Sequence, residues 1–260
     1  MLLSHVENAG WVPLVDLPCT RPQLRSTNFG VTWRDAEPLK DFLGVWDGVA
    51  PGPGAGLLLN HPPHAGRLFM AGHHDVPSEL DVAWFSDDNG ASWKLSNMSN
   101  ISGAPSERSA TASQPWPKQN EFLGFDEPQF TELRNGSVLL SMRRDASGTR
   151  GQALSSDGGR TFLWSTPTIP NHAGGVQQPL ITLSNGTLAY AAPNADGRSN
   201  MTVFTSVDDA NSWSVARNVY SGPSAYSALS EKSNGALVLA YERDVAGCTG
   251  ASCSIEWVVL

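Results

Sequence analysis

Three segments of the sequence place charged or hydroxyl side chains at the ends of apolar runs, where loops can build a site. In the first, Glu127 and Arg143 stand 16 positions apart, at the two ends of a hairpin-like element. Arg198 enters an apolar run, Tyr226 follows a Gly-Pro-Ser turn, and Glu242 ends another apolar run. Arginine can bind a carboxylate through two parallel hydrogen bonds, and carboxylates can accept protons. Taken singly, however, such an arginine is usually a solvated rim residue and such a tyrosine a packing residue.

A repeated eight-residue phrase shows what must position these side chains. Its form is Ser-x-Asp-x-Gly-x-Thr/Ser-aromatic, and one copy reads SDDNGASW. The copies occupy residues 26–33, 86–93, 155–162 and 206–213. Asp can hydrogen-bond the backbone of a turn, glycine accepts a left-handed conformation, and the aromatic ring indicates a turn pinned against a core. We therefore interpret the phrase as a structural Asp-box repeat. Its bracing residues would be Asn28, Asp88, Asp157 and Asp208.

The spacing of the copies and the segments near them predict β-strands. The copies begin on average 60 residues apart, which fits a four-stranded propeller blade slightly longer than the ~40–45 residues of a WD40 blade. Short apolar runs of strand length follow glycine turns at residues 66–74, 136–144, 186–193 and 235–243. Asn-Gly precedes three of these runs, at Asn135, Asn185 and Asn234, and this dipeptide between apolar runs is a strong hairpin signal.

These patterns predict an all-β propeller, because no long stretch has helical periodicity. Propellers often exceed the usual domain size, so residues 1–260 are predicted to form one domain. At 60 residues per blade, the 260 residues provide about four to five blades, near the lower end of the ~4–8 blades that closed propellers have.

Composition narrows the classes of partner. The net charge is −8, the pI is about 5.2, and no run is rich in Lys or Arg, which argues against nucleic acid and anionic membranes. No apolar stretch approaches the ~18–20 residues that span a membrane. The six histidines show no ligand spacing, so we expect neither a metal nor another cofactor.

Three features of the sequence relate to the cellular compartment of the protein: its cysteines, its glycosylation sequons and its N-terminal segment. Cys248 and Cys253 could close a small disulfide or be free thiols in a loop, and Cys19 is left over in either case. The opening MLLSHVENAGW has neither a charged n-region nor a sustained apolar h-region, so it does not read as a signal peptide. Glycosylation sequons occur at Asn97, Asn100, Asn135, Asn185 and Asn200 and favour a secretory route. We expect a lysosomal or secretory location for the full-length protein, with a cytoplasmic location as the alternative.

Repeats of this form, followed by these segments in this order, resemble the sialidase (neuraminidase) superfamily of six-bladed propellers. The resemblance covers nearly the whole chain and is strongest to the animal lysosomal-type and bacterial exo-sialidases. The repeats alone are weakly specific, because other propellers contain them, whereas Tyr226 with Glu242 behind it is much more specific. The matching segments are 50–59, 66–74, 86–93, 126–143 and 222–243.

The resemblance implies a role for each candidate residue. Tyr226 matches the nucleophile of these enzymes, and Glu127 matches the carboxylate that takes its proton. Arg143 and Arg198 match the second and third arginines of the triad that binds the substrate carboxylate, and Glu242 matches the carboxylate that orients the first. Two weaker candidates for the pocket rim are His73 and Asp75.

Two elements of the family pattern have no match. The first triad arginine normally lies in a Phe/Tyr-Arg-Ile-Pro stretch, which Arg21 and Arg25 do not reproduce, and Asp16 is not placed to replace the general acid/base Asp. The match therefore begins partway into the family fold. Six blades of 60 residues need about 360, which leaves about 100 residues of the N-terminal blade region missing. Either the sequence is an incomplete piece of an enzyme, or it is a shortened protein with an open sheet edge.

We expect an exo-α-sialidase that removes terminal sialic acid from glycoproteins, oligosaccharides or gangliosides, with retention of configuration through Tyr226. The alternative is a catalytically impaired propeller that binds sialic acid without hydrolysing the glycoside. The presence of both Tyr226 and Glu127 favours the enzyme, because a lectin needs no activated nucleophile.

Overall fold

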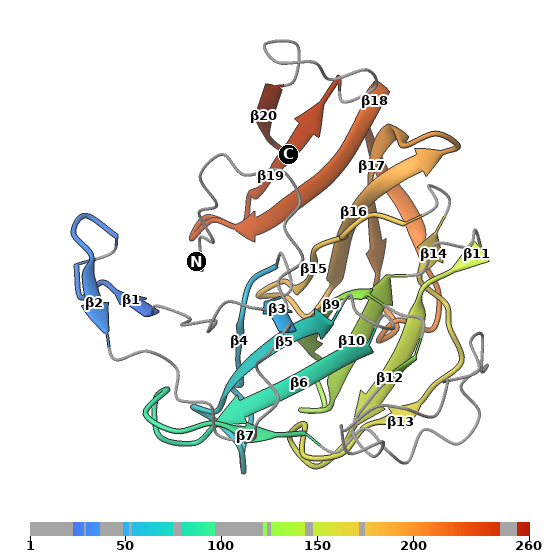
Figure 1. Ribbon diagram of the computed structural model, residues 1–260. Helices are drawn as coiled ribbons and strands as arrows, with labels where there is room; N and C mark the ends of the chain where they lie inside the picture. The colour runs from blue at the N-terminus through green and yellow to red at the C-terminus, as the bar shows by residue number, and fades with distance from the viewer. Residues whose placement is uncertain are drawn as a thin grey trace.

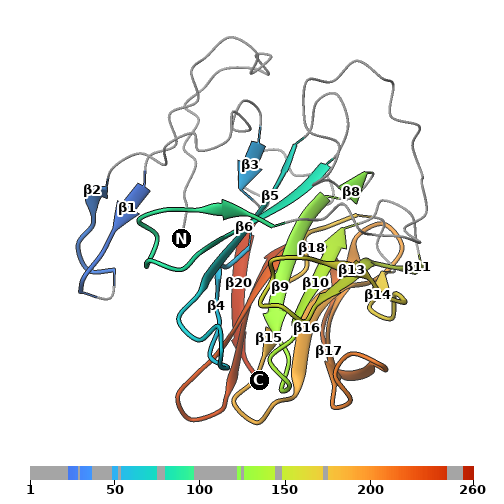
Figure 2. The same ribbon diagram turned by 90° about the horizontal axis from the view of Figure 1, so that it is seen from below.

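The structure of the protein is a computed structural model. The described residues are 23–28, 30–36, 49–51, 54–74, 80–96, 122–123, 126–143, 148–171, 175–244 and 254–260. Within them every regular element is a β-strand and none is a helix, so the prediction of an all-β protein is confirmed. Figure 1 and Figure 2 show the strands grouped into curled sheets.

The first two sheets are built from ten of the strands between Val49 and Trp164. The first sheet comprises β3 (Val49–Pro51), β4 (Leu57–Leu58), β5 (Leu68–His74), β6 (Leu80–Ser86), β7 (Lys94–Leu95) and β8 (Phe122–Leu123). The second comprises β9 (Asp126–Glu132), β10 (Val138–Arg143), β12 (Gly151–Ser155) and β13 (Leu163–Trp164). Two separate antiparallel pairs are β1 (Gln23–Arg25) with β2 (Arg34–Ala36), and β11 (Gly148–Thr149) with β14 (Pro170–Asn171).

The C-terminal strands form two sheets that share one long strand. They are β15 (Leu180–Thr182), β16 (Leu188–Ala195), β17 (Ser199–Ser206), β18 (Ser214–Glu231), β19 (Leu237–Arg243) and β20 (Ser254–Val259). The first part of β18 pairs with β17 and completes the third sheet. From Ser224 onward β18 pairs with β19, which pairs with β20 to give the fourth sheet. In Figure 1 the orange-red β18 runs from its partner β17 to its partner β19.

Each sheet packs against the next through its own apolar cluster. The first cluster joins Phe69 and Phe85 of the first sheet to Phe130 of the second. The next joins the second sheet to the third, and the last joins the third sheet to Leu239 and Tyr241 of the fourth. This succession of face-to-face contacts is the arrangement of propeller blades, as the sequence predicts.

The three predicted Asn-Gly hairpins are confirmed. They connect β9 to β10, β15 to β16 and β18 to β19. Gly136, Gly186 and Gly235 have φ values of 80°, 82° and 81°, a left-handed conformation that glycine adopts without steric cost. The predicted apolar runs are the strands β5, β10, β16 and β19.

The four copies of the repeated phrase form turns with the same hydrogen bonds. In the copy at 86–93, Gly90 N donates to Ser86 Oγ at 2.8 Å, and Ser92 N donates to Asp88 Oδ1 at 2.8 Å. In the first copy, Asn28 Oδ1 accepts from Thr32 N at 2.9 Å, and Asn28 Nδ2 donates to Thr32 Oγ1. An amide therefore makes the same contacts as a carboxylate, with the bond to the hydroxyl reversed in direction.

The carboxylates of these turns should make stability depend on acid pH. Hydrogen bonds, first from Ser92 and from Ser212 respectively, lower the pKa values of Asp88 and Asp208 from 3.8 to about 2. A depressed folded-state pKa gives stability that is present above the unfolded pKa and is lost as the pH falls toward the folded pKa. We expect the thermal midpoint to fall between about pH 4 and pH 2 for this reason.

The double variant Asp88→Asn with Asp208→Asn tests this expectation. Asn28 shows that asparagine supports the turn, but asparagine does not titrate. The thermal midpoint of the double variant should therefore fall less than that of the wild type over the same pH interval. Identical pH dependence in the two proteins would contradict the assigned role of these carboxylates.

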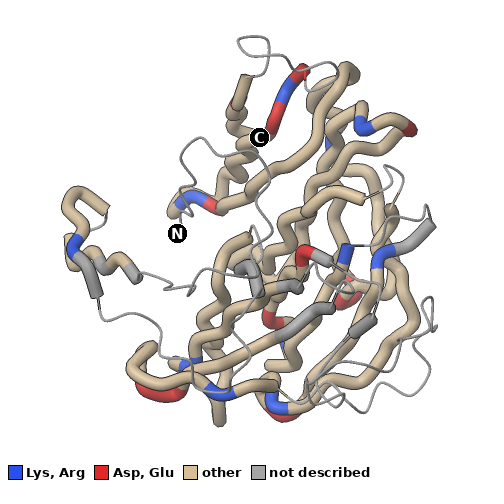
Figure 3. The backbone as a smooth tube through the Cα atoms, viewed as in Figure 1, with Lys and Arg blue, Asp and Glu red and all other residues tan. Residues whose placement is uncertain are grey.

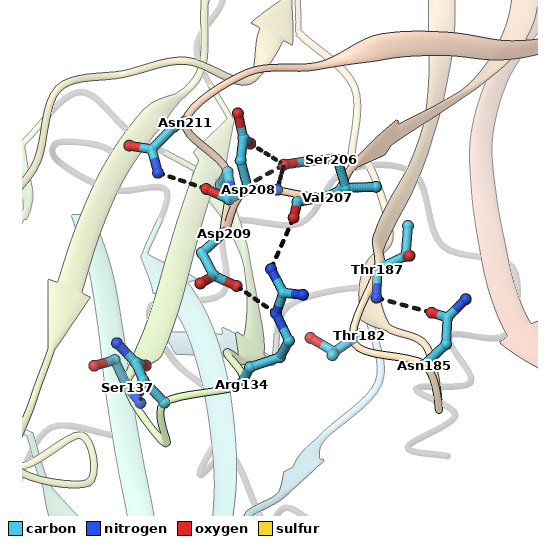
Figure 4. A network of polar contacts seen from close by, with 12 residues as sticks. Arg134, Ser137, Thr182, Asn185, Thr187, Ser206, Val207, Asp208, Asp209 and Asn211 are labelled. Carbon is cyan, nitrogen blue, oxygen red and sulfur yellow. Dashed lines mark hydrogen bonds and ion pairs between the residues drawn. The ribbon is translucent and has the colours of Figure 1, made fainter.

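Arginines link the edge of one sheet to the repeated turn of the next. Arg134, in the turn between β9 and β10, donates from Nη2 to Val207 O at 2.7 Å and lies 3.2 Å from Asp209 Oδ1 (Figure 4). Arg67 makes a comparable link from the first sheet to the second, because its Nη1 donates to Gly158 O at 2.7 Å. Hydrogen bonds as well as apolar contacts therefore set the spacing of adjacent sheets.

Replacing Arg134 with alanine should lower the free energy of unfolding by about 1 kcal/mol, mainly through loss of the bond to the Val207 carbonyl. The ion pair with Asp209 adds little, since Arg134 is half-exposed. Urea denaturation measures the change. Arg217→Ala, at an exposed position on β18, is the matched control and should stay within about 0.5 kcal/mol of wild type. Equal losses in the two variants would show that the link contributes nothing specific.

Candidate active site

The structure brings together Tyr226 of β18 and Glu127 of β9, which are 99 positions apart in sequence. The Tyr226 hydroxyl donates a hydrogen bond of 2.6 Å to Glu127 Oε1. Glu127 is buried and Tyr226 is half-buried, so little water competes for this contact. A nucleophile and its base must lie within this distance for direct proton transfer.

Arg143 closes a triangle with these two side chains. Its Nη1 lies 2.9 Å from Glu127 Oε2 and 3.3 Å from the Tyr226 hydroxyl oxygen. Arg143 ends β10, which pairs directly with β9. Glu127 lies near the start of β9 and Arg143 at the end of β10. The two residues are 16 positions apart in sequence, but the hairpin places them at the same edge of the sheet.

A β-bulge directs Glu127 toward the site. Asp126 pairs with Arg143 and Gln129 pairs with Ser141, so Glu127 and Pro128 together oppose a single residue of β10. Glu127 has a φ of 44°, in the left-handed region that non-glycine residues rarely adopt. Bulges of this kind redirect a side chain at the edge of a sheet.

A second bulge presents Tyr226. Ser224 pairs with Arg243 and Ser227 pairs with Tyr241, so two residues of β18 oppose Glu242 alone. The Tyr226 amide does not join the ladder at this point but donates to Glu242 Oε2 at 3.1 Å. Glu242 thus fixes the backbone of Tyr226, which is a contact that the sequence did not predict for it.

Arg198 lies in the turn between β16 and β17, with a φ of 57°. Its Nη2 donates to the carbonyl of Gly175 at 2.8 Å. Its positive charge lowers the pKa of Tyr226, as does that of Arg143. The Arg198 carbonyl accepts a hydrogen bond of 2.7 Å from the amide of Ser224, two residues before Tyr226. The predicted residues Arg143 and Arg198 therefore lie on the same side of the molecule as Tyr226.

The environment of Tyr226 keeps its hydroxyl protonated. Burial, followed by the hydrogen bond and negative charge of Glu127, raises the pKa of Tyr226 to about 12 against the opposing effect of the two arginines. The hydroxyl is consequently neutral across the physiological pH range. It can lose its proton only as a new bond forms to its oxygen, with Glu127 as the acceptor.

A model of the family described as BNR repeat-like domain matches residues 2–239 of the chain. The chain belongs to the BNR repeat-like domain family. Among curated relatives, a sialidase of Micromonospora viridifaciens is 26% identical over 261 residues, which cover 90% of this chain and 35% of that protein. A sialidase of Bacteroides fragilis is 24% identical, covering 90% of this chain and 41% of that protein. The predicted sialidase superfamily is confirmed, and this BNR repeat-like domain spans well under half the length of both relatives.

Solved structures agree with this fold. The intramolecular trans-sialidase of Ruminococcus gnavus, in complex with oseltamivir carboxylate, is 24% identical with a TM-score of 0.66, covering 91% of this chain and 49% of that one. The leech intramolecular trans-sialidase is 23% identical with a TM-score of 0.66, covering 91% of this chain and 36% of that one. The Trypanosoma rangeli sialidase in complex with sialic acid is 17% identical with a TM-score of 0.61, covering 92% of this chain and 37% of that one. The resemblance to the animal lysosomal type stays a prediction.

The BNR repeat-like domain has a cavity of about 450 Å³. Its lining includes Gln129, two residues after Glu127, and Ser227, which follows Tyr226. Most of the lining comes from β4, β9, β15 and β18. The cavity therefore follows strands of all four sheets, and its lining does not include Glu127, Arg143 or Tyr226.

Other candidates of the sequence analysis fall wholly or partly outside the described residues. His73 lies in β5, but its side chain is outside them, as is Asp75. The three cysteines, the sequons at Asn97 and Asn100, and residues 16 and 21 are also outside. The sequons at Asn135 and Asn185 occupy exposed hairpin turns.

Charged residues gather at strand ends in the described part of the chain. Figure 3 shows most Lys, Arg, Asp and Glu near turns, with tan residues along the strands. None of the described segments includes a helix with the length and hydropathy needed to cross a bilayer. Among the described residues, no three His, Cys, Asp or Glu side chains are grouped so that they could hold a metal ion.

One buried charged residue that contacts a strand of the site was not predicted from the sequence. Arg150 is fully buried and contacts the strand of Arg143. No sequence signal marks it, because burial of this position depends on the packing of separate sheets.

Proposed function

We propose that this chain acts as an exo-α-sialidase, a retaining glycoside hydrolase with Tyr226 as its nucleophile. The observation that supports this best is the 2.6 Å hydrogen bond from the Tyr226 hydroxyl to Glu127, with Arg143 in contact with both. An isolated tyrosine on a strand needs no buried carboxylate at its hydroxyl, whereas a tyrosine that attacks carbon does.

The nature of the substrate explains why a tyrosine would replace the usual carboxylate nucleophile. A sialic acid has its own carboxylate on the anomeric carbon, so an anionic Asp or Glu would meet a negative charge there. The Tyr226 hydroxyl, with a pKa of about 12, is neutral on approach. Sialidases with a tyrosine nucleophile are the known exception to the scheme with two carboxylates.

In the first step of the proposed reaction, Tyr226 Oη forms a bond to the anomeric carbon while the bond to the aglycone oxygen breaks. Glu127 takes the phenolic proton during this attack. In the second step, water displaces the tyrosine from the anomeric carbon, Tyr226 regains a proton from Glu127, and the proton that the water loses is released to solvent. Two displacements at the same carbon retain its configuration. The aglycone oxygen also needs a proton, unless it leaves as a stable aryl oxide.

Arg143 and Arg198 are proposed to bind the carboxylate of the sugar. Guanidinium groups are planar and permanently charged, which suits a carboxylate. Two structural relatives are described as complexes with carboxylate-bearing molecules, one with sialic acid and the other with oseltamivir carboxylate. We propose terminal sialic acid on glycoproteins, oligosaccharides or gangliosides as the substrate, in a lysosomal or secretory setting.

The proposal is tested by hydrolysis of a fluorogenic aryl α-sialoside between about pH 4 and pH 7 by the purified chain. An aryl leaving group needs little protonation, so the assay isolates the step that Tyr226 and Glu127 would perform. We expect release of the aryl alcohol, with α-sialic acid as the first-formed sugar product by NMR. A folded chain that binds sialic acid without hydrolysing the sialoside would indicate a binding module and contradict the proposal.

A further inference from the structure

Arg150 is a fully buried cation near the site. Its side chain has 0% exposure, and burial of a charge is costly unless hydrogen bonds compensate it. Its Nε donates to Ser141 Oγ at 2.8 Å. Ser141 belongs to β10 and stands two positions before Arg143. The guanidinium of Arg150 is thereby attached to the strand that presents Arg143.

The same guanidinium also donates a hydrogen bond to the segment whose carbonyl accepts from Arg198. Arg150 Nη1 donates to the carbonyl of Val176 at 3.0 Å. The carbonyl of the preceding residue, Gly175, accepts from Arg198 Nη2 at 2.8 Å. Adjacent carbonyls therefore receive hydrogen bonds from two different arginines.

We propose that Arg150 is a positioning residue that sets the separation of Arg143 and Arg198, and through it the affinity of the site for a carboxylate. This inference rests on the proposed function, since it assigns Arg150 to the binding of the sialic acid carboxylate. Bidentate recognition depends on geometry, and a misplacement of about 1 Å can cost on the order of 100-fold in catalytic efficiency. Arg150 itself touches the two supporting elements and is not a catalytic residue.

Arg67 provides a matched control. It is also an arginine with almost complete burial, at 3% exposure. Its Nε lies 2.6 Å from Asp87 Oδ1, and its Nη1 donates to Gly158 O at 2.7 Å. Arg67 joins the first and second sheets without contacting the elements of Arg143 or Arg198. Loss of a buried guanidinium can therefore be separated from loss of the positioning contacts.

The experiment compares Arg150→Gln, Arg150→Lys and Arg67→Gln for KM and kcat on the aryl α-sialoside and for Kd of free sialic acid. For Arg150→Gln we expect KM and Kd to rise by about 10- to 100-fold, with a smaller change in kcat. Arg150→Lys keeps the positive charge and can still donate a hydrogen bond toward one of the two partners of Arg150. This variant should therefore recover part of the affinity for sialic acid. Arg67→Gln should lower the thermal midpoint but leave KM within about twofold.

Hydrogen exchange of residues 175–178 provides a readout that needs no activity. Exchange in this segment should be faster in Arg150→Gln than in Arg67→Gln, because only the first variant frees the carbonyl of Val176. Arg150→Gln with the same exchange, KM and Kd as Arg67→Gln would overturn the inference while leaving the proposed function intact. A wild type that neither hydrolyses the sialoside nor binds sialic acid would instead overturn the proposed function, and the assignment of Arg150 with it.

Discussion

Replacing Tyr226 with phenylalanine should reduce hydrolysis of an aryl α-sialoside by on the order of 10³-fold or more. The substitution removes only the hydroxyl, which donates to Glu127 and contacts Arg143. The ring stays in place, so we expect the variant to bind sialic acid with a Kd close to that of the wild type. Steady-state rates and calorimetric binding measure the two quantities separately.

The control for this variant is Tyr241→Phe. Tyr241 lies on β19 and is buried in the apolar cluster between the third and fourth sheets, where its ring packs against that of Tyr220. Its activity should remain within about twofold of wild type. A Tyr226→Phe variant that is as active as Tyr241→Phe would rule out the tyrosine as the nucleophile.

Replacing Glu127 with glutamine should reduce the same rate by about 10²- to 10⁴-fold. The amide oxygen of glutamine can still accept the hydrogen bond from Tyr226, but it cannot take the proton. The hydroxyl would then have to attack the anomeric carbon without a base. Single-turnover kinetics with the aryl substrate should show the loss in the glycosylation step.

The same variant changes the acidity of the nucleophile in a defined direction. The hydrogen bond and negative charge of Glu127 both raise the pKa of Tyr226, whereas Arg143 and Arg198 lower it. Glu127→Gln keeps a hydrogen-bond acceptor but removes the negative charge, so the pKa of Tyr226 should fall below about 12. NMR titration of the tyrosine ring carbon follows this change directly. Glu231→Gln, at the exposed end of β18 where Glu231 bonds Ser184, should change neither the rate nor the pKa.

The repeats and hairpin signals predicted the strands because they depend on local chemistry. Asn-Gly turns require a left-handed glycine, and an apolar run of about seven residues with turns on both sides is typical of a strand. Gly136 and Gly235 show the expected backbone, and β10 and β19 follow them. The number of blades around the whole propeller stays a prediction.

The contact between Tyr226 and Glu127 could be predicted from the family resemblance but not from the sequence pattern. Each of the two residues lies in a β-bulge, where two residues of one strand oppose a single residue of its partner. A bulge shifts the register by one residue, and such a shift cannot be recognised in the hydrophobic periodicity of the sequence. Pro128 and Pro223 are the only local hints, since proline inside a strand often marks a bulge. The hydrogen bond between Glu242 and the Tyr226 amide could not be predicted from the sequence either, because it arises from the second bulge.

The most direct test of the account is to trap the intermediate on Tyr226. A sialosyl fluoride with a second fluorine at C3 has a leaving group that needs little protonation, and the added fluorine slows hydrolysis of the glycosyl-enzyme. Mass spectrometry of the digested protein should then find one sialosyl adduct, on the Tyr226 hydroxyl, that is absent from Tyr226→Phe. An adduct on a different residue, or turnover of the aryl sialoside with Tyr226 never labelled, would contradict the assignment of Tyr226 as the nucleophile.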